Sequence, residues 1–579
     1  MAYPDIGDKN FYNKINKIYD KFKVPKKKKS FDDICFPKKY ELQLPQQFLP
    51  EYINPKTPYK GVLVYHRIGA GKTCTAIRVG EMWKNHRKII VVLPASLKGN
   101  FRSELRSPCA GENYLKESER KQLKQHHPSS TEYKEIIKRS DKRIDDVYTI
   151  YSYNKFVELA NEKKISFKNS VLIIDEVQNM VSEEGLYYST LHKMIYDAPK
   201  DLRIVLLSAT PMFDKPSEIA LTLNLLRMNQ ELPTGRDFYE EYIKILKHKD
   251  GEYSYDVRNM SKFKKIIKGY VSFYRGAPQY VFPELKIKYV KCEMSDFQYK
   301  AYKDVMKKEA VKYTNDRALG DFLAKKILTV EDLPNNFFIG TRMVSNIVFP
   351  NRQINEEGYK SLKGSRIVDQ IEKYSSKFSR ILTKINNSHG KIFIYSSFRE
   401  YGGLRSLTFI LEELGYKNYL QHGEGYKRYA VWSGEEKIQD KDEIRAVYNH
   451  IDNLNGSKLK IILGSPATKE GISFTAVQQV HILEPYWNQS RLEQIIGRAS
   501  RYCSHKDVPE EKRKVKVYVY IAVHQNEKKT VDQHMYILSE QKNKLVGEFE
   551  RAIKEAAVDC TINYNANVYE NEEPITCVV

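Results

Sequence analysis

One stretch of sequence decides the fold, and it reads VLVYHRIGAGKT over residues 62–73. An apolar run that passes within a few positions into glycines, Lys72 and Thr73 is typical of a buried strand turning into a helix. Such a glycine-rich turn wraps main-chain N–H groups around nucleotide phosphates, and the N-terminus of the following helix favours anions. His66 replaces the first glycine of the G-x-x-x-x-G-K-[ST] pattern, so this motif alone is incomplete evidence. We expect the phosphates to be held by Gly69, Ala70, Gly71, Lys72, Thr73 and Cys74.

A second apolar run ends in two adjacent carboxylates. Residues 170–174 read SVLII, which is too short for a helix, and Asp175 and Glu176 follow directly. We expect Thr73 and Asp175 to hold Mg²⁺, directly or through water, while Glu176 polarises the attacking water. Lys72 would neutralise the β- and γ-phosphates. The sequence therefore predicts an enzyme that binds ATP or GTP with Mg²⁺ and hydrolyses the nucleotide.

Two further passages belong to the same chemistry. The apolar run at residues 203–207 leads into Ser208 and Thr210, in the sequence Ser-Ala-Thr-Pro. Far downstream, Arg498 and Arg501 stand three residues apart, which places them on one face if the segment is helical. We expect the two arginines to reach across a cleft to the γ-phosphate, as arginine fingers do.

In this order the passages resemble motifs I, II, III and VI of the superfamily 2 helicases and translocases. They read GAGKT, DEVQ, SAT and QIIGRASR, and residues 92–97 and 464–473 resemble motifs Ia and V. The resemblance implies that Gln178 and Gln494 also line the ATP site. It further implies that a bound nucleic-acid strand is touched, or its presence relayed, by Lys98, Ser208, Thr210, Thr468 and Gly471. A glutamine at 46 or 47 could read adenine, or it could simply lie on the surface.

Within that superfamily the chain is most similar to one viral group, the nucleoside triphosphate phosphohydrolase I and early-transcription-factor small-subunit proteins of poxviruses and other large cytoplasmic DNA viruses. Similar proteins occur on linear cytoplasmic plasmids of yeasts. Four passages carry this likeness, at residues 52–59, 274–278, 484–491 and 557–560. The related viral ATPases also carry a histidine before the loop, which suggests that His66 is accommodated. The likeness extends over roughly residues 40 to 565.

The length of 579 residues exceeds what one hydrophobic core usually serves. Strand-like runs at 61–65, 88–93, 147–151, 170–174 and 203–207 alternate with helical stretches, which predicts a parallel sheet with crossover helices. We expect an α/β chain of two tandem RecA-like lobes with a helical insertion between them. The expected parts are a basic flexible segment at 1–40, lobe 1 at 41–232, a linker and helical insertion at 233–375, lobe 2 at 376–530 and a C-terminal helical extension at 531–579.

Net charge, cysteine content and the lack of long apolar runs indicate which partners and which cellular compartment to expect. A formal net charge of +23 favours a polyanionic partner, although Lys-rich composition also follows from an A/T-rich genome. The seven cysteines form no C-x-x-C pair, so we expect neither a zinc site nor a disulfide framework. We find no signal peptide and no run of about 18 apolar residues, so we expect no membrane association. The expected location is the host cytoplasm and the virion interior.

Three classes of function remain open. The first is a DNA-dependent ATPase that tracks a single strand in viral-type transcription, with an RNA polymerase or a second transcription-factor subunit as partner. The second is a helicase that separates strands of RNA or DNA, and the third is a promoter-binding or assembly subunit with weak ATPase. Intact Lys72, Asp175, Glu176 and Arg501 argue against the third class. DEVQ in place of DEAD disfavours DEAD-box RNA unwinding.

Overall fold

A computed structural model describes residues 3–26, 29–67, 69–126, 130–181, 185–247, 253–313, 338–466, 473–569 and 572–579. The chain forms two compact units, which are described separately below. Unit 1 comprises Met1–Gln279 and Lys544–Val579, and unit 2 comprises Tyr280–Asn543. In sequence, helix α23 (Val531–Glu555) contains the boundary between Asn543 and Lys544.

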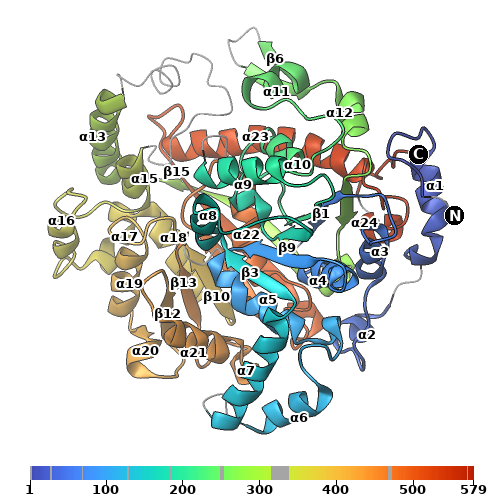
Figure 1. The fold of residues 1–579 in the computed structure, drawn as a ribbon. Helices are drawn as coiled ribbons and strands as arrows, with labels where there is room; N and C mark the ends of the chain where they lie inside the picture. Colours follow the sequence, from blue (N-terminus) through green and yellow to red (C-terminus); the bar gives the residue numbers. More distant parts are fainter. Residues whose placement is uncertain are drawn as a thin grey trace. The chain divides into compact units, whose positions relative to one another are not determined.

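Unit 1 is built on a six-stranded sheet whose paired strands are all parallel, in the order β3-β2-β4-β5-β1-β8. Because helices cover both faces of such a sheet, its strands read as continuous apolar runs. The strands are β1 (Gly61–His66), β2 (Lys88–Leu93), β3 (Tyr148–Ser152), β4 (Ser170–Ile174), β5 (Arg203–Ser208) and β8 (Val271–Tyr274). The helices are α1 (Phe11–Ile18), α2 (Phe31–Cys35), α3 (Leu44–Tyr52), α4 (Lys72–Trp83), α5 (Lys98–Leu105), α6 (Glu117–Gln125), α7 (Thr131–Asp145), α8 (Tyr153–Asn161), α9 (Leu186–Asp197), α10 (Glu218–Asn224), α11 (Gly235–Tyr242), α12 (Met260–Ile266) and α24 (Tyr564–Asn567) (Figure 1).

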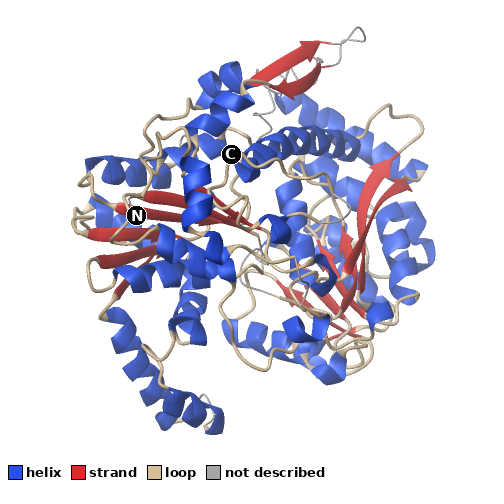
Figure 2. Cartoon of the chain, turned by 90° about the vertical axis from the view of Figure 1, so that its right-hand side faces the viewer, coloured by secondary structure: helices blue, strands red, loops and turns tan. Residues whose placement is uncertain are grey.

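Unit 2 contains a seven-stranded parallel sheet in the order β11-β12-β13-β10-β14-β15-β9. The strands are β9 (Glu284–Glu293), β10 (Lys391–Tyr395), β11 (Lys417–Asn418), β12 (Arg428–Trp432), β13 (Ile461–Gly464), β14 (Val477–Ile482) and β15 (Lys514–Val523). The helices are α13 (Asp296–Tyr313), α15 (Ile339–Asn346), α16 (Glu356–Lys360), α17 (Ile371–Tyr374), α18 (Ser376–Asn386), α19 (Leu404–Glu413), α20 (Tyr419–His422), α21 (Ile438–Asn449) and α22 (Gln489–Ala499). Figure 2 shows strands flanked by helices, and the predicted pair of RecA-like lobes is confirmed.

The prediction that residues 233–375 form a linker and a helical insertion is wrong in part. It contributes β8 to the first sheet and β9 to the second, and it also forms an antiparallel hairpin from β6 (Ile243–Lys247) and β7 (Tyr253–Val257). Strand β9 reads ELKIKYVKCE and is largely exposed, and in the described part of the chain it is an edge strand paired with β15 alone. Its lysines interrupt the apolar run that would otherwise have predicted a strand.

The N-terminal end of the chain also differs from the prediction. Residues 1–40 were expected to be flexible, yet α1 buries Phe11 and Ile15 completely in the core of unit 1. The C-terminal extension from Lys544 onward belongs to unit 1 and packs Val558 into the same core. Short helices far from their partners in sequence give no local signal of such packing, because burial depends on tertiary contacts.

The expectation of no disulfide bonds is also wrong. Cys74 is bonded to Cys109, and Cys560 is bonded to Cys577. Separations of 35 and 17 residues leave no spacing motif, since only the fold brings these sulfurs together. Among the described residues, no helix combines the length and apolar character needed to cross a bilayer.

Candidate active site

The phosphate-binding loop joins β1 to α4 in unit 1. Gly69 and Gly71 have φ values of +85° and +71°, which glycine adopts at no steric cost, and Gly71 caps the N-terminus of α4. Lys72 and Thr73 are the first residues of that helix, where unpaired N–H groups attract anions. Gln46 of α3 supports the turn, because its Nε2 donates to the Gly71 carbonyl at 3.3 Å. Gln46, for which the sequence allowed either an adenine-reading role or a place on the surface, therefore lies against the loop.

Two carboxylates meet Lys72 at the end of β4. Lys72 Nζ lies 2.6 Å from Glu176 Oε1 and 3.5 Å from Asp175 Oδ1. Burial lowers the pKa of Lys72, but the charges of Glu176 and Asp175 outweigh it and leave the pKa above its usual value. Burial raises the pKa of Asp175, and Lys72 opposes that rise. The structure therefore brings together the three predicted ionic residues of motifs I and II.

The backbone at this strand end is held in an unusual conformation. Glu176 has a φ of +51°, a left-handed value that costs a residue with a side chain roughly 1–3 kcal/mol. The Tyr153 hydroxyl donates to the carbonyls of Asp175 and Glu176, the latter at 2.8 Å. No sequence motif predicted a role for Tyr153, because it lies more than twenty residues upstream on α8.

A buried network continues from the carboxylates to motif III. Gln178 Nε2 donates to Glu176 Oε2 at 2.6 Å, and the Ser208 hydroxyl donates to Gln178 Oε1 at 2.7 Å. The Thr210 N–H in turn donates to Ser208 Oγ at 3.0 Å. Ser208 is fully buried, so of its two predicted roles the relay is favoured over direct contact with a nucleic-acid strand. Lys98, the first residue of α5, is half-buried, and its contact with nucleic acid stays a prediction.

The donor set suits a magnesium nucleotide. The Thr73 hydroxyl and the Asp175 carboxylate are hard oxygen ligands of the kind that Mg²⁺ takes, and Asp175 is buried beside Lys72. When bound, the ion would neutralise charge on the phosphates. The sulfur of Cys74 is bonded to Cys109, so a role for Cys74 in holding phosphate could come only from its main chain.

The predicted arginines lie in unit 2, on and just after α22. Arg498 is buried and Gln494 is half-buried on this helix. Arg501 follows it, and its Nε donates to the Gly497 carbonyl at 2.9 Å. Their approach to a nucleotide stays a prediction. Thr468 and Gly471, predicted to contact nucleic acid, lie outside the described residues.

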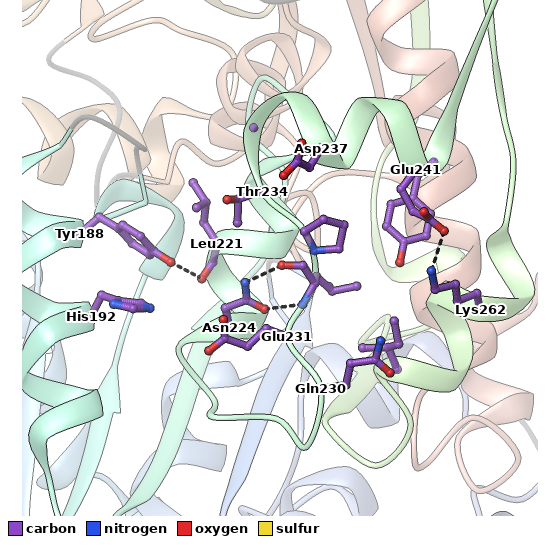
Figure 3. Close-up of a pocket in the computed structure, with 15 residues that line it drawn as sticks. Tyr188, His192, Leu221, Asn224, Gln230, Glu231, Thr234, Asp237, Glu241 and Lys262 are labelled. Carbon is purple, nitrogen blue, oxygen red and sulfur yellow. Dashed lines mark hydrogen bonds and ion pairs between the residues drawn. The ribbon is translucent and has the colours of Figure 1, made fainter.

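Unit 1 also contains a pocket of about 880 Å³ that is lined by none of the predicted site residues (Figure 3). Tyr188, His192, Glu231 and Asp237 line it. Asn224 also lines it, and its side chain donates to the Leu232 carbonyl and accepts from the Leu232 N–H, each at 2.9 Å. This pocket is therefore distinct from the glycine-rich loop.

Comparison with known proteins decides the family. The family model of the SNF2-related domain matches residues 40–338, and that of the helicase conserved C-terminal domain matches residues 376–503. The chain belongs to the SNF2-related helicases of superfamily 2. It is therefore an ATP-hydrolysing enzyme. That the loop, the paired carboxylates and the Ser208 network form its ATPase site stays a prediction.

Similar proteins come from large DNA viruses. R563 of Acanthamoeba polyphaga mimivirus, provisionally named an ATP-dependent RNA helicase, is 53% identical over all of this chain and 99% of its own length. A helicase of Invertebrate iridescent virus 3, also provisionally named, is 29% identical over 92% of this chain, which spans 54% of that protein. A protein of African swine fever virus named a termination factor NPH-I homolog is 25% identical over 87% of this chain and 77% of its own length.

The geometry indicates how this SNF2-related ATPase uses its residues. Lys72 can pair with Glu176 or with a phosphate, and exchange of the lysine between them would free Glu176 Oε1 to accept a proton from water. Gln178 holds the other carboxylate oxygen, Oε2, and so fixes the direction in which Glu176 points. Ser208 in turn holds Gln178, so motif III is connected to Glu176 through two hydrogen bonds.

Proposed function

We propose that this SNF2-related ATPase couples ATP hydrolysis to translocation along DNA in viral-type early transcription, at initiation or termination. Mg²⁺ serves as the cofactor, and one strand of the DNA is tracked. An RNA polymerase or a second transcription-factor subunit is the proposed protein partner. The proposed place of action is the host cytoplasm and the virion interior.

The observation that carries the proposal is the partly buried link from Lys72 through Glu176 and Gln178 to Ser208. It gives motif III a direct mechanical connection to the residue that polarises water, which a nucleic-acid-stimulated ATPase needs. The SNF2-related match and the African swine fever virus relative, named a termination factor homolog, support DNA and transcription. The net charge of +23 supports a polyanionic track.

A second candidate is an RNA helicase, and one observation favours it. The mimivirus relative that is 53% identical over the full chain carries that name. The ATPase residues would look the same in both cases, because they act on ATP and not on the track. Only the choice of activating polymer and the fate of a duplex separate the two candidates.

The first test compares the steady-state ATPase rate of the full chain with no polymer, single-stranded DNA, duplex DNA and single-stranded RNA of equal length. Glu176→Gln serves as the blank, because it keeps the shape of the side chain and removes the base. Strong stimulation by DNA and weak stimulation by RNA is the expected result. Stronger stimulation by RNA than by DNA would replace the proposal by the RNA helicase.

A second assay separates translocation from strand separation. A translocating motor displaces streptavidin from a biotinylated strand end in an ATP-dependent reaction, whereas a helicase also releases a paired strand. We expect streptavidin displacement from DNA without release of the complementary strand. Absence of ATP-dependent displacement, with the ATPase intact and DNA-stimulated, would refute translocation.

A further inference from the structure

A buried chain of hydrogen bonds runs from the C-terminal segment to the strand that leads into the phosphate-binding loop. Asp559 Oδ2 accepts from Ser272 Oγ at 2.6 Å, and Ser272 Oγ lies 3.0 Å from His66 Nε2. All three side chains are completely buried. Ser272 lies on β8, and His66 is the last residue of the neighbouring strand β1. A carboxylate nearly five hundred residues away is thereby connected to the position before the glycine-rich turn.

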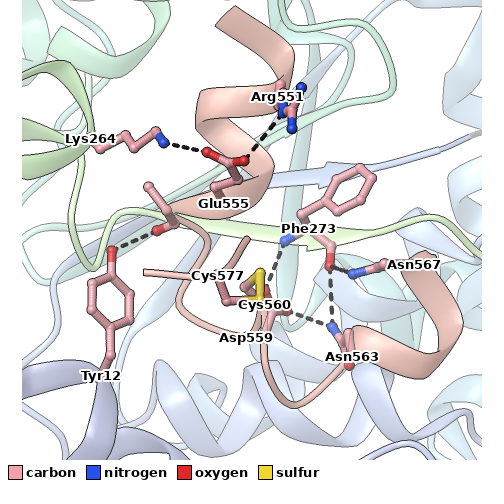
Figure 4. Close-up of a disulfide and its surroundings, with 11 residues drawn as sticks. Tyr12, Lys264, Phe273, Arg551, Glu555, Asp559, Cys560, Asn563, Asn567 and Cys577 are labelled. Carbon is pink, nitrogen blue, oxygen red and sulfur yellow. Dashed lines mark hydrogen bonds and ion pairs between the residues drawn. A yellow bond between two sulfur atoms is a disulfide. The ribbon is translucent and has the colours of Figure 1, made fainter. Parts of the chain in front are cut away.

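The carboxylate of Asp559 is itself held firmly. Its Oδ1 accepts from the Phe273 N–H at 2.9 Å, and its Oδ2 also accepts from Asn563 Nδ2 at 2.9 Å. Asn563 Nδ2 lies 3.2 Å from the Phe273 carbonyl as well (Figure 4). Asp559 is therefore fixed to the backbone of β8 on one side and offers Ser272 an acceptor in one position only.

The direction in which hydrogens are donated along this series of hydrogen bonds sets the tautomer of His66. When Asp559 is ionised, above the pKa of about 7 to which burial raises it, Ser272 donates its single hydroxyl hydrogen to Asp559 and must accept from a hydrogen on His66 Nε2. His66 Nδ1 is buried with no hydrogen-bond partner among the described residues, which suits a lone pair better than an N–H. Burial, with a smaller effect of the Lys72 charge, lowers the pKa of His66 to about 3, so the ring stays neutral.

The same strand and C-terminal segment support the loop beyond His66. The Arg67 N–H donates to the Tyr274 carbonyl at 3.0 Å, and the Arg67 guanidinium lies 3.1 Å from Glu550. Gly276 has a φ of +100°, and a Cβ there would lie 3.2 Å from Ala70 Cα in the glycine-rich turn. The loop thus rests on β8 and the residues after it, and these in turn rest on the C-terminal segment.

We propose that Asp559 is a positioning residue of the ATPase, which acts through Ser272 and His66 to hold the phosphate-binding loop in the conformation that binds ATP. The inference rests on ATP hydrolysis by this chain and is independent of the nucleic acid that it tracks. The chain of hydrogen bonds reaches the loop and not Glu176. Breaking it therefore weakens nucleotide binding and leaves the rate of the chemical step nearly unchanged.

The kinetic test uses the full chain with no nucleic acid. In Asp559→Asn and Ser272→Ala, KM for ATP and Kd for ADP are expected to rise by on the order of tenfold, with kcat within about twofold of the wild type. The matched control is Tyr12→Phe. The Tyr12 hydroxyl donates to the Ala556 carbonyl at 2.8 Å in the same C-terminal segment, so its loss removes a buried hydrogen bond without touching the chain to His66 (Figure 4).

Coupling between the variants distinguishes positioning from general loosening. The double variant Asp559→Asn/Ser272→Ala is expected to bind ADP no more weakly than either single variant. Each substitution alone already breaks the same series of hydrogen bonds. Tyr12→Phe with Ser272→Ala should be additive. An unchanged Kd in both Asp559→Asn and Ser272→Ala, or an equal effect in Tyr12→Phe, would overturn the proposal.

A spectroscopic readout follows the proton directly. In Asp559→Asn, we expect the amide oxygen to stay on the Phe273 N–H and Asn563 to turn its Oδ1, which has no partner among the described residues, toward the new amide nitrogen. The amide nitrogen then donates to Ser272, which reverses the direction of the hydrogen bonds. The ¹⁵N spectrum of histidine-labelled protein should then show the hydrogen of His66 moved from Nε2 to Nδ1, with the signal assigned by its absence in His66→Asn. An unmoved hydrogen in folded Asp559→Asn would refute the relay, even if the DNA-stimulated ATPase were confirmed. Failure of DNA stimulation would leave this result untouched.

Discussion

Replacing Ser208 by alanine tests the buried link between motif III and the catalytic carboxylate. The substitution removes one oxygen atom that is completely buried in unit 1. Gln178 Oε1 loses its donor, the Ser208 hydroxyl at 2.7 Å. The Thr210 N–H loses its acceptor, Ser208 Oγ at 3.0 Å. Gln178 then loses the contact that holds its amide toward Glu176.

The magnitude follows from the two groups that are left unpaired. A buried polar group without a partner costs about 1–3 kcal/mol, so two such groups should lower the free energy of unfolding by about 2–6 kcal/mol. The effect on catalysis is separate from that loss. A Glu176 carboxylate that is no longer oriented through Gln178 should slow kcat by about tenfold, which corresponds to about 1.4 kcal/mol of transition-state stabilisation.

The assay measures kcat and KM for ATP, with thermal unfolding of the same samples. Thr222→Val is the matched control, because the Thr222 hydroxyl is buried in unit 1 with no hydrogen-bond partner among the described residues. The control should change neither kcat nor stability by much. A kcat for Ser208→Ala within twofold of the wild type would refute the argument that Ser208 orients Glu176 through Gln178.

Two further predictions concern the C-terminal segment. Burial raises the pKa of Asp559 to about 7, so its stabilising contribution is present at low pH and is lost as the pH rises through about 7. Wild-type stability relative to Asp559→Asn should therefore fall by about 1 kcal/mol between pH 6 and pH 8 in chemical denaturation, and a rise would show that the folded-state pKa is depressed instead. Cys560 and Cys577 close a 17-residue loop, so Cys577→Ser should lower the free energy of unfolding of oxidised protein by about 3 kcal/mol. An unchanged melting temperature, or no linked peptide in a non-reducing digest of the wild type, would contradict the bond.

Much of the ATPase site was predictable because its residues stand next to strong local signals. Lys72 and Asp175 each follow a buried apolar strand, and parallel strands deliver their carboxyl ends to one edge of a sheet. The meeting of Lys72 with Glu176 at 2.6 Å follows from that arrangement. The direct link through Gln178 to Ser208 was not predicted, since motif order does not specify which polar atoms pair.

Other elements could not be predicted, for reasons that the structure makes plain. Strand β9 carries alternating lysines because it lies at a sheet edge, where one side of the strand has no neighbour within the described sheet. Helix α1 is short and polar on one face, and its Phe11 packs against Tyr59, many residues away. The disulfide between Cys74 and Cys109 likewise depends on where α4 and the segment after α5 lie.

The sequence by itself determined the chemistry, because glycine-rich turns, strand-end carboxylates and paired arginines are local patterns with a fixed purpose. It also determined the two parallel sheets, since buried strands must be continuously apolar. Only the tertiary structure decided what supports the phosphate-binding loop. Asp559, Ser272 and His66 come from three distant parts of the chain, and each is an ordinary polar residue in its own neighbourhood. Their hydrogen bonds exist because folding buries them together, and a buried polar group must find a partner.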